Sequence, residues 1–115
     1  MNDCIFCRIV RGEIPSKKVY EDETLLAFND VRPKAPTHIL IIPKRHIETL
    51  TDCTNDDAPL LGKMLALAPV IAKEQGCREG FRTIINTGRV GGQEVYHLHI
   101  HILGGPQVLP PMIQH

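Results

Sequence analysis

His97, His99 and His101 alternate with aliphatic residues near the end of the chain. Because side chains alternate faces along a β-strand, this spacing predicts a strand with three imidazoles on one face and a buried aliphatic set on the other. Successive imidazoles are expected about 6–7 Å apart, since each residue rises roughly 3.3 Å along a strand. Imidazole changes charge near neutral pH, so such a row favours metal ligation, or nucleophilic and acid–base chemistry, over a purely structural role.

A second group with chemical potential begins at Cys4 and Cys7, which are separated by two residues. On a helix this spacing puts both sulfurs on the same side, as in a metal clip, a redox dithiol or a pair of core cysteines. Redox use typically requires a thioredoxin-like βαβ context, which the chain does not predict. A zinc clip needs two more ligands, for which His46 and His97 are the natural candidates. A closed Cys₂His₂ zinc site would be structural, because it leaves no open position for water.

The elements that must position these side chains follow from apolar periodicity and turn residues. The predicted elements are a helix over 4–11, capped by Asp3 and ended by Gly12; strands over 17–21, 24–29, 38–42, 81–86 and 94–103; and a long helix from about 56–57 to 75, ended by Gly76. Pro69 inside the long helix predicts a kink or a helix in two pieces. This order, with short connections, predicts an α+β domain built on an antiparallel sheet.

Composition bounds the class of protein. With 115 residues the chain predicts one domain, 1–115. Thirteen basic and 13 acidic residues cancel, which argues against a nucleic-acid-binding face or a polybasic membrane patch. The longest apolar stretch, 60–72, is interrupted and too short to span a bilayer, and the N-terminus lacks the pattern of a signal peptide. We therefore expect a cytoplasmic protein whose four cysteines do not form a disulfide framework.

The segment 91–105, GGQEVYHLHIHILGG, resembles the signature of the histidine triad (HIT) superfamily, and is most similar to its nucleotide-binding branch. Shorter motifs at 5–6, 12–15, 28–31, 35–38 and 42–46 occur in the order found in that branch. The resemblance covers nearly the whole chain. It implies a HIT-like fold, with a five-stranded antiparallel sheet, one long and one short helix, and a sheet continued across a homodimer.

The resemblance also implies an activity, the hydrolysis of purine nucleoside phosphoramidates through a nucleotidyl-histidine intermediate. By position, His99 matches the nucleophile, His101 and His38 match histidines that bind the phosphate, and His97 is the first histidine of the triad. Asp30 matches the carboxylate that holds the ribose hydroxyls. The residues that the resemblance places around the nucleotide are Ile5, Phe6, Ile9, Phe28, Asn29, Asp30, Val31, Asn86, Gly92 and Gln93. The chemistry needs no metal.

Glu94 stands where many animal members of the branch have a serine proposed to help protonate the departing amine. A carboxyl group could act there as a general acid. A solvated glutamate at a strand edge explains the residue equally well, and both interpretations stay open. The zinc set of Cys4, Cys7, His46 and His97 is similar to that of superfamily members such as galactose-1-phosphate uridylyltransferases.

Three other functions compete. Dinucleoside polyphosphate hydrolases of the same superfamily usually carry a glutamine two residues before the triad, whereas Gln93 lies four residues before His97. This spacing favours the nucleotide-binding branch. A nucleotide-binding regulatory dimer with little turnover is compatible with the same residues. A catalytic metalloenzyme ranks lowest, because three histidines on one flat strand fit a single tetrahedral ion poorly.

Overall fold

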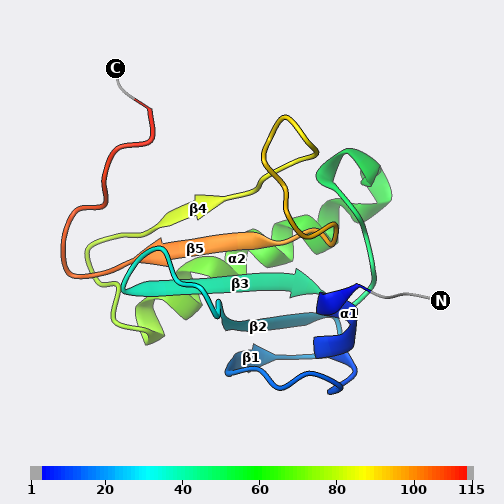
Figure 1. Cartoon of the computed structure of the whole chain (residues 1–115), viewed down its shortest axis with the longest axis horizontal. Helices are drawn as coiled ribbons and strands as arrows, with labels where there is room; N and C mark the ends of the chain where they lie inside the picture. The colour runs from blue at the N-terminus through cyan, green and yellow to red at the C-terminus, as the bar shows by residue number, and fades with distance from the viewer. Residues whose placement is uncertain (1–3, 114–115) are drawn as a thin grey trace.

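The computed structural model describes residues 4–113, which form a five-stranded antiparallel sheet with helices on both faces (Figure 1). The order across the sheet is β1-β2-β3-β5-β4. This arrangement confirms the predicted α+β class and the five strands. The elements are α1 (Ile5–Val10), β1 (Lys18–Glu21), β2 (Leu25–Asn29), β3 (Thr37–Pro43), the 3₁₀ turns η1 (Leu50–Asp52) and η2 (Asn55–Asp57), α2 (Ala58–Glu74), β4 (Arg82–Ile84) and β5 (Ile100–Gly104).

The two faces of the sheet carry separate apolar clusters. Ile39 and Ile41 of β3 pack with Ile100 and Ile102 of β5 under α2, in the larger cluster. Alternate residues of the strands point the other way, where α1 covers part of the face. Because β3 and β5 alternate in this manner, the face opposite α2 receives the histidines of both strands. The larger core therefore supports the strands from behind and leaves the histidine face partly open.

The histidine strand is shorter than predicted. β5 begins at Ile100, so only His101 of the triad lies within a regular strand, and His97 and His99 lie in the segment that leads into it. At Leu98 the peptide N–H donates to the carbonyl of Ile47, 2.7 Å away, in a segment outside the sheet. The ring centroids of His99 and His101 are 4.9 Å apart, closer than an extended strand predicts. The segment is therefore shaped by contacts with the chain around residue 47.

The sequence predicted a kink or a helix in two pieces at Pro69, and the second alternative is wrong. α2 continues through Pro69 from Ala58 to Glu74 as one helix. Proline removes one peptide N–H, which leaves the carbonyl of Leu65 without its helical donor. Leu65 and Pro69 are both exposed, on the side of α2 away from the core, where water can bond that carbonyl.

The remaining helix and strand boundaries differ from the predicted ones by at most two residues. Strand β4 covers only 82–84 of the predicted 81–86, and α1 starts one residue later than predicted. Asp57 precedes α2 as predicted, but its side chain accepts the peptide N–H of Thr54 instead of capping the helix. The predicted cap Asp3 lies outside the described residues. Within 4–113, no helix has the length and apolar content needed to cross a membrane.

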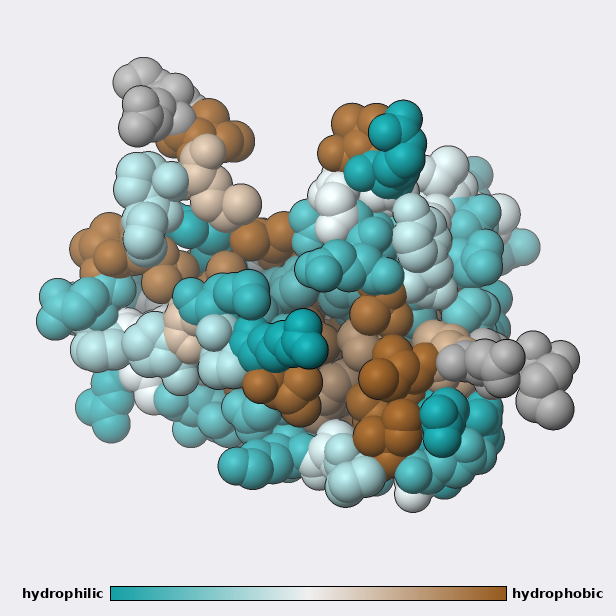
Figure 2. Space-filling model, viewed as in Figure 1, coloured by the Kyte–Doolittle hydropathy of each residue, from teal (hydrophilic) through white to brown (hydrophobic). Residues whose placement is uncertain are grey.

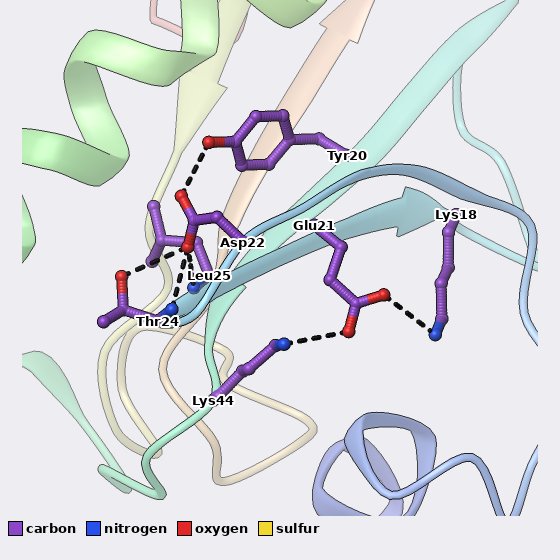
Figure 3. A network of polar contacts seen from close by, with 7 residues as sticks. All are labelled: Lys18, Tyr20, Glu21, Asp22, Thr24, Leu25 and Lys44. Atoms are coloured by element: carbon purple, nitrogen blue, oxygen red, sulfur yellow. Dashed lines mark hydrogen bonds and ion pairs between the residues drawn. The ribbon is translucent and has the colours of Figure 1, made fainter.

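The β1–β2 turn has no glycine and is closed by an aspartate instead (Figure 3). One carboxylate oxygen of Asp22 accepts the peptide N–H groups of Thr24 and Leu25, both at 2.8 Å, and the other accepts the hydroxyl of Tyr20 at 2.6 Å. These donors hold the pKa of the Asp22 carboxyl well below its usual range, with the Tyr20 hydroxyl as the largest cause. Lys63 of α2 also contacts Asp22, at 2.9 Å, so the turn is tied to the helix.

Candidate active site and metal cluster

The first functional cluster joins β3 to β5. His38 lies on β3 and His101 on β5, and the Nε2 atom of His38 is 2.9 Å from the Nδ1 atom of His101. The carboxylate of Asp30, in the loop after β2, lies 3.4 Å from the same Nε2 atom. The peptide N–H of Lys34 donates to the Nδ1 atom of His38 at 3.0 Å. The structure thus brings together three residues that the sequence predicted for one site.

His99 lies beside this cluster with its protonation defined by the backbone. Its Nδ1 atom is 2.7 Å from the carbonyl oxygen of His97. A carbonyl only accepts, so Nδ1 carries the proton and Nε2 keeps its lone pair in the neutral ring. The rings of Phe6 and His99 pack edge to face, with centroids 5.1 Å apart. This contact also restrains the imidazole.

The histidines of this cluster are neutral at pH 7. Burial lowers the pKa of His38 and of His99 below the ordinary value, because desolvation disfavours the charged ring. Burial also lowers the pKa of His101 to about 4, helped by its neighbours His99 and His38. A neutral His99 is the form that can act as a nucleophile.

A groove adjoins His38 and Asp30. Its volume is about 750 Å³, enough for a nucleotide-sized ligand. Hydrophobic side chains gather over α1 on the same face of the molecule, next to a hollow (Figure 2). The groove is lined by Pro15, Ser16, Lys17, Asn29, Asp30, Val31, Pro33, Pro36 and His38.

The apolar residues that the resemblance places around the nucleotide divide into two kinds. Phe6, Ile9 and Phe28 are buried in the smaller apolar cluster, so they form its interior. Ile5 and Val31 are exposed, Val31 to 89%, and are free to contact a ligand. Among the predicted nucleotide contacts in this region, Asn29, Asp30 and Val31 line the groove itself.

The glycine-rich loop before the triad is held together by its own amides. Gln93 accepts the peptide N–H of Gly88 and donates to the carbonyls of Glu48 and Val95. Gln93 therefore supports the loop, and its contact with a nucleotide stays a prediction. Similarly, the amide of Asn86 donates to the carbonyl of Gly91 at 2.8 Å.

Backbone geometry explains two glycines of this loop. Gly92 has a φ of +77°, a conformation that side chains rarely adopt. At Gly91 a Cβ would lie 2.4 Å from the carbonyl oxygen of Thr87, so only glycine permits this close approach. Glu94, directly after the loop, is exposed, and no contact within residues 4–113 draws its carboxylate toward the triad. Its two interpretations are not separated by these contacts.

The second cluster contains the four predicted metal ligands, which the fold brings together from three segments. The ligand atoms of Cys4, Cys7, His46 and His97 all lie within 4.8 Å of one another. The Nδ1 atom of His97 is 3.3 Å from the Cys4 sulfur and 3.2 Å from the Nδ1 atom of His46, which is itself 3.2 Å from the Cys7 sulfur.

These spacings and this chemistry fit a tetrahedral zinc ion. Ligands about 2.0–2.3 Å from one centre lie roughly 3.3–3.8 Å from each other at tetrahedral angles. The Nε2 atom of His97 is 2.7 Å from the carbonyl oxygen of Pro43, so it carries the proton and leaves Nδ1 free to bind a metal. The four residues therefore fit the structural zinc ion that the sequence predicted.

Sequence reasoning missed the backbone groups that define these sites. The Lys34 N–H and the carbonyls of Pro43 and His97 determine which ring nitrogen carries each proton. No residue type indicates such contacts, because any non-proline residue supplies the same peptide N–H and every residue supplies the same carbonyl.

Comparison with known proteins agrees with this geometry. Residues 3–112 match the family described as "Scavenger mRNA decapping enzyme C-term binding". The crystal structure of a HIT family hydrolase from Legionella pneumophila is 51% identical, superposes with a TM-score of 0.90, and the match covers 95% of this chain and 98% of the other. The chain belongs to the HIT family.

Curated HIT-family relatives match over nearly their full lengths. The purine nucleoside phosphoramidase of Escherichia coli K12 is 50% identical over 98% of this chain and 95% of its own length. Protein HitA of Neisseria gonorrhoeae is 53% identical over 92% of this chain and 99% of its own. These findings identify a HIT-family hydrolase domain and confirm the resemblance found in the sequence.

Proposed function

We propose that this HIT protein hydrolyses purine nucleoside phosphoramidates at the α-phosphate, with His99 as the nucleophile. The observation that carries the proposal is the hydrogen bond from the Nδ1 atom of His99 to the carbonyl of His97. It leaves a neutral imidazole with its Nε2 lone pair available beside His101 and near the groove. The 50% identity to a purine nucleoside phosphoramidase supports the choice of substrate class.

In the first step, the Nε2 atom of His99 attacks phosphorus and the P–N bond breaks. The bond's electron pair stays on nitrogen, which takes one proton from Glu94 if this residue is a general acid, or from solvent water if it is not. The ring now carries a positive charge, and its Nδ1–H still donates to the carbonyl of His97. That carbonyl stabilises the charge as it develops.

In the second step, water attacks the phosphorus of the nucleotidyl-histidine. The P–Nε2 bond breaks and returns its electron pair to His99. The attacking water passes one proton to the group that supplied one in the first step, and the nucleoside monophosphate is released. His101 lies next to the nucleophile and supplies a donor for the phosphoryl oxygens, and the contact with His38 supports its ring. The net reaction consumes one phosphoramidate and one water and yields a nucleoside monophosphate and an amine.

The proposal is tested with a fluorogenic adenosine phosphoramidate and a diadenosine polyphosphate as parallel substrates. We expect turnover of the phosphoramidate, a strong preference for it, and a nucleotide attached to His99 in enzyme quenched during turnover. A preference for the diadenosine compound identifies the dinucleoside polyphosphate hydrolase instead. Tight AMP binding with no turnover of either identifies a nucleotide-binding regulatory protein.

We propose further that Cys4, Cys7, His46 and His97 hold one structural zinc ion. The ion would connect α1 to the segment before β5 and fix the position of His97. Four protein ligands would leave no open position for a reacting water. The test is the zinc content of the purified protein, expected at one per chain and lost in Cys4→Ser. Cys53→Ser is the matched control, because Cys53 packs beside the main core, away from this cluster.

We also propose a homodimer in which two sheets join. Within the described chain, β1 and β4 are the edge strands, so one of them provides the junction. Strand edges carry unpaired peptide groups that a second sheet can satisfy. Light scattering of the purified protein is expected to give twice the chain mass; a monomeric mass at micromolar concentration contradicts the proposal.

A further inference from the structure

One peptide N–H in the loop between β2 and β3 determines the proton positions of two catalytic-site histidines. We propose that the N–H of Lys34, acting through His38, holds His101 as the tautomer with its proton on Nε2, so that His101 offers a donor to the phosphoryl group. Lys34 is a positioning residue in this scheme, and it acts through its backbone alone. The part of the inference that concerns the phosphoryl group rests on the proposed function.

The first link is the contact between Lys34 and His38. The peptide nitrogen of Lys34 lies 3.0 Å from the Nδ1 atom of His38. A peptide N–H only donates, so Nδ1 must accept and can carry no proton. His38 is 5% exposed, so the opposite tautomer would leave two donors facing each other without water to satisfy them. A neutral His38 therefore carries its proton on Nε2.

The second link is the contact between His38 and His101, which determines the tautomer of His101. The Nε2 atom of His38 is 2.9 Å from the Nδ1 atom of His101. Since Nε2 of His38 is the donor, Nδ1 of His101 is the acceptor, and the neutral ring of His101 keeps its proton on Nε2. The carboxylate of Asp30, 3.4 Å from the Nε2 atom of His38, also favours a proton at that position.

The chemical consequence concerns the reacting phosphoryl group. A donor placed beside a developing negative charge stabilises the transition state, whereas a lone pair at the same place repels it. The chain Lys34 N–H to His38 to His101 makes the outward nitrogen of His101 a donor while both rings stay neutral. No cationic histidine is needed for this stabilisation.

The test begins with the tautomers of the wild-type protein. Long-range proton–nitrogen correlation spectra of ¹⁵N-labelled full-length protein at pH 7 distinguish a bare ring nitrogen from a protonated one. We expect His38 and His101 both with the proton on Nε2, and His99 with the proton on Nδ1. Single histidine substitutions assign the signals. A proton on Nδ1 of His38 or of His101 overturns the proposal, whatever the activity.

The variant Lys34→Pro removes the peptide N–H, and Lys34→Ala is its matched control, because it keeps the N–H and deletes only an exposed side chain. In Lys34→Pro we expect His38 and His101 to become mixtures of tautomers. We expect kcat to fall roughly tenfold, less than the roughly 10²–10³-fold cost of deleting a transition-state donor, because part of the population keeps the donor tautomer. KM is expected to change less than kcat. Lys34→Ala is expected to keep the wild-type tautomers, because it keeps the peptide N–H.

The outcomes separate the inference from the proposed function. Unchanged tautomers in folded Lys34→Pro overturn the relay even if turnover falls. Expected tautomers in a wild-type protein that hydrolyses no phosphoramidate support the relay and contradict the proposed function. If Lys34→Pro does not fold, the wild-type spectrum alone decides between the two tautomers of each ring.

Discussion

Two clusters in this molecule have residues that metals prefer, but their backbone partners give them opposite properties. Cys4, Cys7, His46 and His97 form one, and Asp30, His38 and His101 form the other. In the first, the carbonyl of Pro43 holds the proton of His97 on Nε2, away from the cluster. In the second, the N–H of Lys34 keeps the proton of His38 inside the cluster, between the two rings.

The difference shows that ligand type alone does not make a metal site. A metal on the Nε2 atom of His38 requires that nitrogen to lose its proton, and Nδ1 cannot receive it while Lys34 donates there. His97 needs no such change, because its Nδ1 atom already faces the sulfurs with a lone pair. Backbone donors and acceptors thus leave the first cluster better suited to a metal and the second better suited to hydrogen bonding.

The largest expected effect separates catalysis from metal binding. His99→Ala removes the nucleophile, so we expect kcat to fall by at least about 10³-fold, as for other enzymes that lose a covalent nucleophile. Zinc content and oligomeric mass are expected to match wild type, because His99 contributes no ligand atom to the cysteine cluster. Wild-type turnover of an adenosine phosphoramidate by folded His99→Ala would falsify the assignment.

Loss of a thiolate ligand is expected to have the largest effect on stability. Cys7→Ser removes a buried ligand and should lower the free energy of unfolding by about 3 kcal/mol or more, since metal affinity contributes directly to folding. Urea unfolding with zinc analysis measures both quantities. Cys53→Ser serves as the control, and an equal loss in the two variants would show that the cluster has no special role.

Asp30→Asn tests the second cluster without changing the first. It removes the carboxylate charge that faces the groove and His38. We expect KM for the phosphoramidate to rise roughly tenfold, the scale of one charged hydrogen bond, while zinc content stays at one per chain. A variant that loses zinc would show that the second cluster, not the first, holds the ion.

The smallest expected effect is a pH dependence of stability. Burial lowers the pKa of His101 to about 4 in the folded protein, whereas an unfolded histidine titrates near 6.5. Between these values the unfolded chain binds more protons, so stability is complete above pH 6.5 and falls as the pH drops toward 4. His101→Asn should flatten this slope relative to wild type in urea titrations at several pH values; an unchanged slope contradicts the shift.

Much of the fold could be predicted because local patterns and tertiary packing agree. The aliphatic run of β3 and the spacing of α2 indicated buried faces, and both are buried. The prediction of a helix in two pieces at Pro69 and that for the length of the histidine strand failed where tertiary context dominates. An exposed helix face tolerates Pro69, and the contact of Leu98 with Ile47 replaces strand pairing before residue 100.

The candidate site was predictable in its residue types and less so in its connections. The spacing of the triad and of Cys4 and Cys7 indicated reactive groups, and the fold brings them to two clusters. The sequence did not predict that the amide of Gln93 supports the loop. Which nitrogen of each ring carries a proton depends on peptide groups far away in sequence, such as Pro43 for His97.

His97 contacts both the cysteine cluster and the nucleophile. Its ring lies beside the sulfur of Cys4, and its carbonyl accepts the Nδ1–H of His99. A small electrophile that modifies the half-buried Cys4 would act on a sulfur 3.3 Å from the ring of His97, the residue whose carbonyl supports His99. Cys4 does not line the groove, so such inhibition need not compete with substrate. An inhibitor screen read out only by displacement of bound nucleotide would miss such compounds.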